Sequence, residues 1–253
     1  MRSNSIPELD PTLVEHRRIW ETKPALRVIY ADYHRRLLNA CPRGLVLDIG
    51  GGSAHVKHYR GDVISADILP FPGIDVVCDA HVLPFAEGSL SGIVMLDVLH
   101  HLERPVNFLR EAARVLRPGG VLAMIEPGMT TLSYPFYRYM HQEPADLRAD
   151  PFKPANRRGD KDPWDSNQAI PTLLFARERN ASEVRRQVPN LKLVSLEWLS
   201  VVAYPLSGGF KPWCLVPAGA AEWLIRMEDH LPRAVRQFGA FRLFAVLERT
   251  NRP

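Results

Sequence analysis

Hydrophobic residues follow two different periods along the chain. Between Leu13 and Ala40 they recur every three or four positions, which predicts helices over residues 11–21 and 25–40. The break falls at Lys23-Pro24, because a proline inside a helix removes a backbone donor and clashes with the preceding turn. From residue 44 onward, short runs of Val, Ile and Leu predict strands. These strand candidates are residues 44–49, 62–67, 74–78, 91–97 and 120–126.

Two stretches between the strand candidates have helical character. Residues 53–59 follow a glycine-rich turn and can begin a helix, and residues 105–116 place Val106, Leu109 and Ala113 on one face. Strands that alternate with helices build a mainly parallel sheet that is covered on both faces. The predicted fold class is therefore α/β, with a doubly wound sheet.

The chain changes character after Pro127. Residues 127–190 are rich in proline, aromatic and charged residues and are too long for a plain connector. Two more strands are predicted, from Leu191 to Tyr204 and from Phe241 to Arg249, with a helix near residues 217–230 between them. The expected organisation is a helical flap (1–43), an α/β core (44–126), a lid insertion (127–190), and C-terminal strands that complete the sheet (191–253) around a helical insertion (205–239).

The sequence Asp48-Ile49-Gly50-Gly51-Gly52 joins the first strand candidate to the next helical stretch. A strand, a glycine turn and a helix start form the nucleotide-binding corner of an open α/β sheet. A dinucleotide fingerprint would need its third glycine at His55, and a carboxylate at Asp48 would repel a pyrophosphate. The pattern instead favours a cationic ligand without phosphate, such as S-adenosylmethionine (SAM).

Acidic residues also end the next two strand candidates. Asp67 lies 19 residues after Asp48, where an acid in open α/β folds accepts hydrogen bonds from ribose hydroxyls. Asp79 and Ala80 follow the third strand candidate, so that the carboxylate can accept from an adenine amino group while the Ala80 amide faces a ring nitrogen. The turn at residues 83–85, Leu-Pro-Phe, adds apolar surface for the base.

Together with the Leu-His-His-Leu turn at 99–102 and the Leu-Arg-Pro-Gly-Gly turn at 116–120, these motifs resemble the methyltransferase type 11 subgroup of the class I SAM-dependent methyltransferases. The resemblance spans about residues 44–126 and implies a Rossmann-like, seven-stranded sheet whose last strand is antiparallel. Ala54, in place of the last motif glycine, and Ser91-Gly92, where Phe-Asp often opens the strand, depart from the pattern. The implied cofactor-binding residues are Asp48, Gly50 and Gly52 at the methionine end, Asp67 and Ile68 at the ribose, Asp79 and Ala80 at the adenine, and the backbone around Asp97 beside the methionine moiety.

His100, His101 and Glu126 are the candidates for a catalytic role. Methyl transfer depends mainly on positioning, so a base is needed only if the acceptor must lose a proton. Histidine has a suitable pKa, although in the family that the chain resembles this pair often shapes the turn and contacts SAM. Glu126 ends a strand at the edge where substrates arrive, and it is either a functional acid or a buried one paired with an arginine. No metal site is expected from these three residues.

Other side chains outside the core have two readings each. Tyr30 or Tyr33 would reach the methionine carboxylate if the second helix covers the cofactor, and core packing is the alternative. Residues in the insertions either line an acceptor pocket or form the small core of the lid itself. These are His141, Glu143, Trp164 and Trp213.

Composition and charge add few restrictions. The chain has 253 residues, a net charge of +4 and a pI near 9.1. This positive charge allows weak attraction to nucleic acid or to an anionic membrane. The basic residues are dispersed, with Arg157-Arg158 and Arg185-Arg186 as the densest pairs, so a solvated surface is expected and peripheral membrane contact stays open. No run approaches the ~20 apolar residues of a membrane span, and the N-terminus lacks an apolar signal core, which predicts a cytoplasmic protein. The three cysteines lack metal or disulfide spacing.

The predicted function is methyl transfer from SAM to a small-molecule, sugar or lipid-linked acceptor, at oxygen before nitrogen or carbon. Nucleic acid is not expected, because the segment Asp97-Val98-Leu99-His100 lacks the Asn/Asp-Pro-Pro-aromatic turn of base-flipping enzymes. One alternative is an NAD(P)-dependent oxidoreductase, which Asp48 and His55 oppose. The other is a non-catalytic SAM-binding scaffold or partner protein, which stays open because class I enzymes share no obligatory catalytic side chain.

Overall fold

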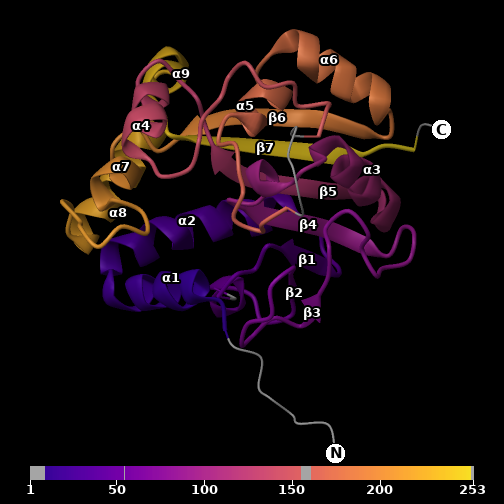
Figure 1. Ribbon diagram of the computed structural model, residues 1–253, viewed down its shortest axis with the longest axis horizontal. Coiled ribbons are helices and arrows are strands. Elements are labelled where there is room, and N and C mark those ends of the chain that lie inside the picture. The colour runs from indigo at the N-terminus through magenta and orange to yellow at the C-terminus, as the bar shows by residue number, and fades with distance from the viewer. Residues whose placement is uncertain (1–8, 54, 155–160, 252–253) are drawn as a thin grey trace, which may run out of the picture.

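The computed structural model describes residues 9–53, 55–154 and 161–251, in which one seven-stranded sheet runs through the molecule (Figure 1). The order of the strands across the sheet is β3-β2-β1-β4-β5-β7-β6. Ala54 and Arg157-Arg158, which the sequence analysis singled out, lie outside the described residues. The strands are β1 (Val46–Ile49), β2 (Ile64–Asp67), β3 (Val76–Val77), β4 (Leu90–Leu96), β5 (Leu116–Pro127), β6 (Leu191–Leu199) and β7 (Arg242–Arg249).

The first five strands pair in parallel, whereas β7 is antiparallel to both β5 and β6. This confirms the predicted seven-stranded, doubly wound sheet with an antiparallel last strand. Because β1 to β5 run the same way, their carboxyl ends meet at one edge of the sheet. That edge is where open α/β sheets bind their ligands.

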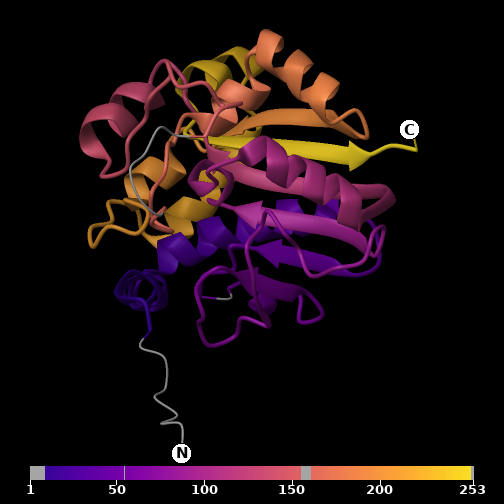
Figure 2. The ribbon, with the colours of Figure 1, turned by 45° about the vertical axis from the view of Figure 1, so that its right-hand side comes forward.

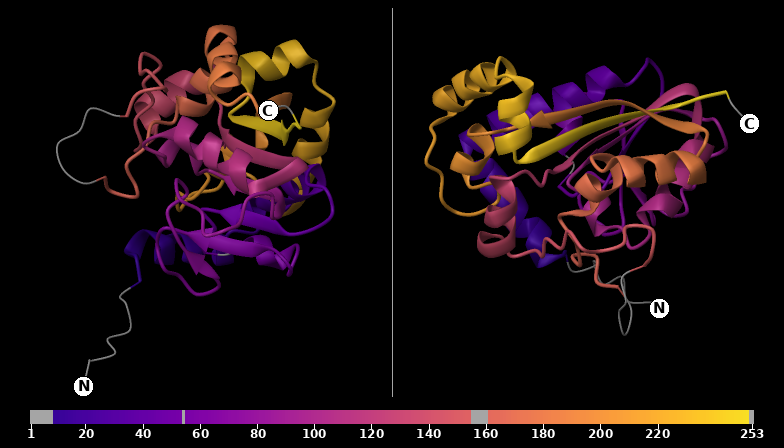
Figure 3. Two further views of the ribbon diagram at one scale, coloured as in Figure 1. Left: turned by 90° about the vertical axis from the view of Figure 1, so that its right-hand side faces the viewer. Right: turned by 90° about the horizontal axis from the view of Figure 1, so that it is seen from above.

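Helices cover both faces of the sheet, as Figure 3 shows from above. Alternate residues of a strand point to opposite faces. Accordingly, Ile93 packs on the side of α3, α5 and α6, and Val94 packs on the side of α2, α7 and α8. The helices are α1 (Pro11–Thr22), α2 (Pro24–Ala40), α3 (Pro105–Val115), α4 (Ser133–Met140), α5 (Ile170–Phe175), α6 (Glu178–Gln187), α7 (Ala203–Ser207), α8 (Ala218–Asp229) and α9 (Arg233–Gly239).

The helix expected from residues 53–59 is absent from the described part of that stretch, which contains only a single 3-10 turn, η1 (His55–His58). The run His-Val-Lys-His-Tyr has low helix propensity, and its rings contact the N-terminal helices. Trp20 stacks on His55 with ring centroids 4.1 Å apart and on His58 at 5.2 Å. Tertiary stacking therefore replaces a helix after the glycine turn.

The segment predicted as a lid insertion, 127–190, divides into two parts. Its later part forms α5 and α6, which contribute Leu174, Phe175 and Val184 to the main core against the sheet. Its earlier part, with α4, lies beyond the carboxyl edge of the parallel strands, near α7 and the N-terminal helix (Figure 2). Strand β6 ends at Leu199 rather than near Tyr204, because Ser200 takes a left-handed conformation (φ 62°) and α7 follows.

Candidate functional site

A cavity of about 560 Å³ lies at the carboxyl edge of the parallel strands. Its walls come from the turns after β1, β2, β3 and β4, from α1 and α2, and from the segments around α4 and α7. Ten of the eleven site residues predicted from the sequence line it, and Glu126 does not. Those ten are Asp48, Gly50, Gly52, Asp67, Ile68, Asp79, Ala80, Asp97, His100 and His101.

The glycine turn after β1 is closely packed against neighbouring strands. Gly50 has a φ of +70°, and a Cβ added there would lie 2.2 Å from a methyl carbon of Val98. At Gly51 an added Cβ would lie 2.0 Å from the hydroxyl of Ser65. Only glycine satisfies both the left-handed backbone and the close approach, so the backbone of the turn is left exposed toward the cavity.

Two carboxylates flank this turn. Asp48 is buried and accepts a hydrogen bond from the Ser65 hydroxyl (3.0 Å). Burial raises the pKa of Asp48 to about 7, with a further contribution from Asp67. Asp67 accepts from the backbone amides of Gly52 (2.8 Å) and Leu69 (2.9 Å), which fixes its carboxylate at the end of β2. Hydrogen-bond acceptors therefore lie where the sequence predicted binding of the methionine end and the ribose of SAM.

The third acid and its neighbours form the opposite wall. Asp79 accepts hydrogen bonds from the backbone amide (2.8 Å) and ring Nδ1 (2.7 Å) of His81. Its side chain is about half exposed, at 53%. Burial opposes ionisation of Asp79, but the hydrogen bonds from His81 outweigh it and lower its pKa. Ala80 is buried and Ile68 is exposed along the same wall.

Asp97 ends β4 in a left-handed conformation, with a φ of 61°. Its carboxylate is paired with the guanidinium of Arg242, one contact being 3.1 Å, and accepts from the hydroxyl of Tyr30 (3.1 Å). Arg242 is buried and lies over the ring of Tyr204, with Cζ 3.9 Å from the centroid. Tyr30 therefore reaches the cavity, whereas the hydroxyl of Tyr33 bonds Ser200 (2.6 Å). No sequence motif pointed to Arg242.

Glu126 is a buried support for the turn after β4. Its Oε1 accepts from the backbone amides of Val98 (2.8 Å) and Leu99 (2.7 Å). Its Oε2 lies 2.6 Å from Nδ1 of His100. The carboxylate is 1% exposed. Of the two alternatives that the sequence left open, the buried acid agrees with this position, although its partners are a histidine and two amides instead of an arginine.

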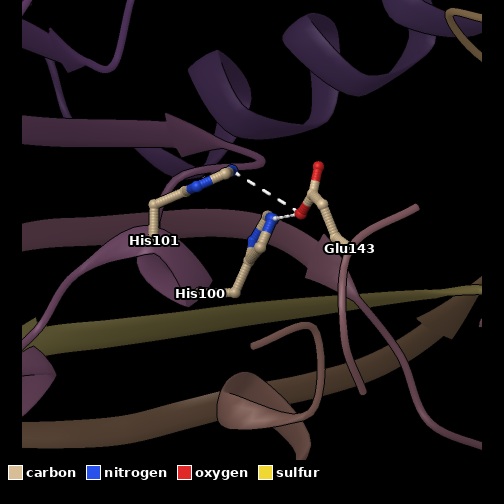
Figure 4. A group of neighbouring side chains, drawn as sticks. All are labelled: His100, His101 and Glu143. Carbon is tan, nitrogen blue, oxygen red and sulfur yellow. Dashed lines mark ion pairs between the residues drawn. The ribbon is translucent and has the colours of Figure 1, made fainter. Parts of the chain in front are cut away.

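His100 and His101, in the turn η2 (Leu99–His101), meet Glu143 from the segment after α4 (Figure 4). Glu143 Oε2 lies 3.4 Å from Nε2 of His100 and 3.9 Å from Nε2 of His101. Burial opposes protonation of His100, but its two carboxylate partners outweigh that and raise its pKa to about 10. Burial lowers the pKa of His101 to about 3, with the charge of His100 adding to the effect.

Aromatic contacts bring the N-terminal helix to the other side of the cavity. Trp164 donates its indole N–H to Asp10 (3.2 Å), and the ring of Phe210 stacks on His16 at 4.4 Å. The ammonium of Lys23 lies 2.5–2.9 Å from four backbone carbonyl oxygens between residues 207 and 213, which share its three N–H groups. His141, Glu143 and Trp164 line the cavity as the sequence suggested. Trp213 is outside the set of residues that line it, with its ring against Gly208.

The residues at the strand ends fit SAM. A close glycine turn leaves backbone amides accessible, two buried or half-buried carboxylates suit an ammonium and ribose hydroxyls, and apolar Ile68 and Ala80 lie beside Asp79 for a base. A pyrophosphate would meet the carboxylates of Asp48 and Asp67. The donor and acceptor set is therefore that of a cationic, hydroxylated adenosyl ligand.

Comparisons with known proteins agree with this geometry. Residues 47–124 match the family model of the methyltransferase domain. A 27-O-demethylrifamycin SV methyltransferase of Amycolatopsis mediterranei is 35% identical over 71 residues, which are 28% of this chain and 24% of that protein. A ubiquinone/menaquinone biosynthesis C-methyltransferase of Desulfotalea psychrophila is 34% identical over 116 residues, 38% of this chain and 47% of that protein. A mouse tRNA (carboxymethyluridine(34)-5-O)-methyltransferase is 46% identical over 48 residues, 18% and 7% of the two chains.

The similarity to these relatives is local, because each match covers less than half of the relative's length. Among solved structures, a SAM-dependent methyltransferase from Thermotoga maritima has the same fold, with a TM-score of 0.54 and 15% identity over 94% of this chain and 97% of that one. Relatives named for oxygen, carbon and tRNA methylation leave the acceptor open. Within the described residues, no helix is long and apolar enough to cross a membrane. The chain therefore contains, in residues 47–124, a methyltransferase domain of the class I SAM-dependent methyltransferase family.

Proposed function

We propose that this protein transfers a methyl group from SAM to a hydroxyl oxygen of a small-molecule, sugar or lipid-linked acceptor. One observation carries the proposal. A single cavity of about 560 Å³ joins the three strand-end acids to the wall formed by His101, Glu143 and Trp164. A donor and an acceptor bound in one cavity are held as reaction partners, which is the main requirement for methyl transfer.

The cofactor half of the cavity is assigned from its acceptors. Asp48, Gly50 and Gly52 would hold the methionine end of SAM, with the backbone around Asp97 beside it. Asp67 and Ile68 would bind the ribose, and Asp79 and Ala80 the adenine. When bound, SAM supplies a methyl group on a positively charged sulfur. The acids are suited to that charge because their side chains accept hydrogen bonds and carry negative charge when ionised.

The reaction forms a bond between the acceptor oxygen and the methyl carbon and breaks the bond between that carbon and sulfur. The electron pair of the broken bond stays on sulfur, and the hydroxyl proton leaves the acceptor. As the new bond forms, the oxygen becomes positively charged and its proton becomes acidic, so a weak base suffices. His101 and Glu143 are the wall residues placed to accept this proton and pass it to water.

His100 and Glu126 have a positioning role in this proposal. Glu126 is held by two backbone amides and holds His100, which in turn contacts Glu143. The carboxylates on both sides of His100 raise its pKa to about 10, which favours its protonated form as long as no metal ion is bound. A protonated imidazole cannot accept a proton, so His100 fixes Glu143 rather than acting as the base.

The contacts over the cavity favour a small acceptor over a folded nucleic acid. The pairs Trp164–Asp10 and Phe210–His16 join the lid segments to α1. Entry of a base that is part of a polynucleotide would require these contacts to separate. The exclusion of nucleic acid stays a prediction, since several relatives are named for tRNA methylation.

The test begins with calorimetric titration of the protein with S-adenosylhomocysteine and, in parallel, with NAD. We expect binding of the first only, and Asp67→Asn and Asp79→Asn should each weaken it about tenfold, the value of one hydrogen bond to a charged group. Asp62→Asn, at an exposed acid beside the same strand, is the matched control. Binding of NAD alone would overturn the proposal.

Turnover is then measured by mass spectrometry on a panel of hydroxylated small molecules, sugars and lipid-linked sugars. The expected result is a product heavier by one methylene, with the added methyl group on oxygen. Binding of S-adenosylhomocysteine with no product from any acceptor class would favour a non-catalytic SAM-binding protein. Methylation of RNA in the same assay would replace the proposed acceptor class.

A further inference from the structure

Three side chains with metal-binding atoms meet at the wall of the cavity (Figure 4). One nitrogen each of His100 and His101 and a carboxylate oxygen of Glu143 lie within 4.8 Å of one another. No metal site was expected from the sequence, and the acid considered as a ligand beside His100 and His101 was Glu126. In the structure Glu126 is behind His100, and Glu143 takes its place on the cavity side.

The distances are close to those that a bound ion needs. Tetrahedral ligands about 2.0 Å from Zn²⁺ lie about 3.3 Å apart. Glu143 Oε2 is 3.4 Å from Nε2 of His100 and 3.9 Å from Nε2 of His101. A small rotation of the His101 ring would complete the set. The Nδ1 atom of His101 is buried and has no hydrogen-bond partner among the described residues, so the rotation would break no hydrogen bond at that atom.

Two of the three side chains are already held in place by hydrogen bonds. A ligating histidine commonly donates its other ring N–H to a carboxylate, which fixes the ring and its tautomer. Nδ1 of His100 lies 2.6 Å from Glu126 Oε2, leaving Nε2 toward the cavity. Oε2 of Glu143, the oxygen that faces both histidines, accepts from the hydroxyl of Ser166 (2.7 Å) and the amide of Gln168 (2.5 Å), and an ion bound at this oxygen would lengthen those bonds. His100 and Glu143 are therefore oriented before any ion binds.

We propose that His100, His101 and Glu143 bind one transition-metal dication of the Zn²⁺ class, with its remaining coordination positions open to the cavity. Two imidazole nitrogens and one carboxylate suit Zn²⁺, Fe²⁺ or Co²⁺. Mg²⁺ and Ca²⁺ prefer oxygen ligands and are not expected here. Three protein ligands with open positions characterise metal sites that bind substrates rather than sites that only stabilise the fold.

The ion would select the acceptor, an extension that rests on the proposed function. An acceptor with two neighbouring oxygen donors, such as a vicinal diol or a hydroxy acid, could fill the open positions. Coordination acidifies a hydroxyl group. Its proton would then pass to water instead of to His101 or Glu143, which would be occupied as ligands.

The test is direct metal binding without SAM or acceptor, so that its result does not depend on the proposed function. Tag-free protein, treated with a chelator and dialysed, is titrated with Zn²⁺ against a chromophoric chelator and with Co²⁺ by visible absorption. We expect one ion per chain and no response to Mg²⁺. His101→Ala and Glu143→Gln should each weaken Zn²⁺ binding by about 100-fold or more, because loss of an outer partner alone costs about 10- to 100-fold.

His230→Ala, at an exposed histidine at the end of α8, is the matched control and should bind Zn²⁺ as the unaltered protein does. A second measurement guards against variants that fold poorly: Zn²⁺ should raise the melting temperature of the unaltered protein and of the control, but not of Glu143→Gln. Equal affinity in His101→Ala, Glu143→Gln and the control would assign the ion to surface histidines. Absence of Zn²⁺ binding would reduce the cluster to a hydrogen-bonded ion pair. Either result overturns the proposal.

Discussion

Asp97 and Arg242 form an ion pair that crosses the sheet from the end of β4 to the start of β7, although β5 lies between those strands. Arg242 is almost fully buried, with a side chain 3% exposed, and Asp97 is 26% exposed. The pair holds the left-handed residue Asp97 at the junction where the cavity begins. This ion pair thus links Arg242, at the start of β7, to Asp97 in the wall of the cavity.

Arg242→Met should destabilise the protein by about 2 to 4 kcal/mol, since removing one partner of a buried pair leaves the other uncompensated and Asp97 keeps some solvent. Urea denaturation measures the change. In Asp97→Asn/Arg242→Met the loss should be smaller than the sum of the two single losses. Arg226→Met, which removes an exposed pair with Glu222, is the control and should change little. Additive losses would show that the pair does not couple the strands.

Lys23 fixes the segment that carries Phe210. Its ammonium donates to the carbonyls of Ser207, Gly209, Lys211 and Trp213 from the junction between α1 and α2. Lys23→Met keeps most of the side-chain volume but leaves those carbonyls without their donor. We expect faster hydrogen–deuterium exchange over residues 207–213, which mass spectrometry of peptides can measure.

The matched control for this prediction is Lys57→Met. Lys57, in η1, pairs with Asp75 (2.6 Å), and its loss should leave the exchange of residues 207–213 unchanged. If that segment stays equally protected in Lys23→Met, its order comes from the stacking of Phe210 on His16 instead.

Gly92 departs from the family pattern for a packing reason. A Cβ added at Gly92 would lie 2.7 Å from Sγ and 2.8 Å from Cβ of Cys41, at the end of α2. Gly92→Ala should cost about 1 to 3 kcal/mol, as overpacking of a core does. Thermal unfolding measures it. Adding Cys41→Gly removes both contacts, so the double variant should regain most of the stability that Gly92→Ala loses. If its stability stays as low as that of Gly92→Ala, the strain lies elsewhere in β4.

Much of the fold could be predicted from the sequence because the signals are local. Runs of Val, Ile and Leu marked all seven strands within a few residues, and Lys23-Pro24 marked the break between α1 and α2. The helix expected at residues 53–59 was wrong for a reason outside that stretch: Trp20 stacks on His55 and His58. The core role of α5 and α6 was hidden by their short, mixed sequences within an aromatic insertion.

The candidate site shows the same division. Asp48, Asp67 and Asp79 could be placed near one another from the sequence because each lies at or just after the carboxyl end of a strand, and the parallel sheet brings those ends together at the cavity. Arg242 was missed because its partner Asp97 is 145 residues away in sequence. Glu126 was assigned to the cavity from its place at the end of β5, but β5 ends in a buried position. The position of an acid at the end of a strand predicted that it would lie near the other strand ends. It could not predict which carboxylate would be exposed to the cavity.

Asp48 should make cofactor affinity depend on pH. Burial raises the pKa of Asp48 to about 7, and of the nearby charges Asp67 raises it and Lys57 lowers it. The ammonium group of S-adenosylhomocysteine is attracted more strongly to the ionised form of Asp48, so affinity for this ligand should rise from pH 6 to about pH 8 and then level off. Calorimetric titration across this range measures it. In Asp48→Asn the affinity should be lower at pH 8 and nearly independent of pH.

The stability of the free protein should move in the opposite direction. Between about pH 4 and pH 7 the folded state keeps a proton on Asp48 that the unfolded chain releases, so the free energy of unfolding falls as pH rises. The pKa of Asp67 is also raised, and it adds to the same trend. The measurement is therefore the difference in free energy of unfolding between the unaltered protein and Asp48→Asn, from urea denaturation at each pH. A difference that does not change over this range would show that Asp48 is ionised throughout, and the carboxylate would then act as a fixed charge at the glycine turn.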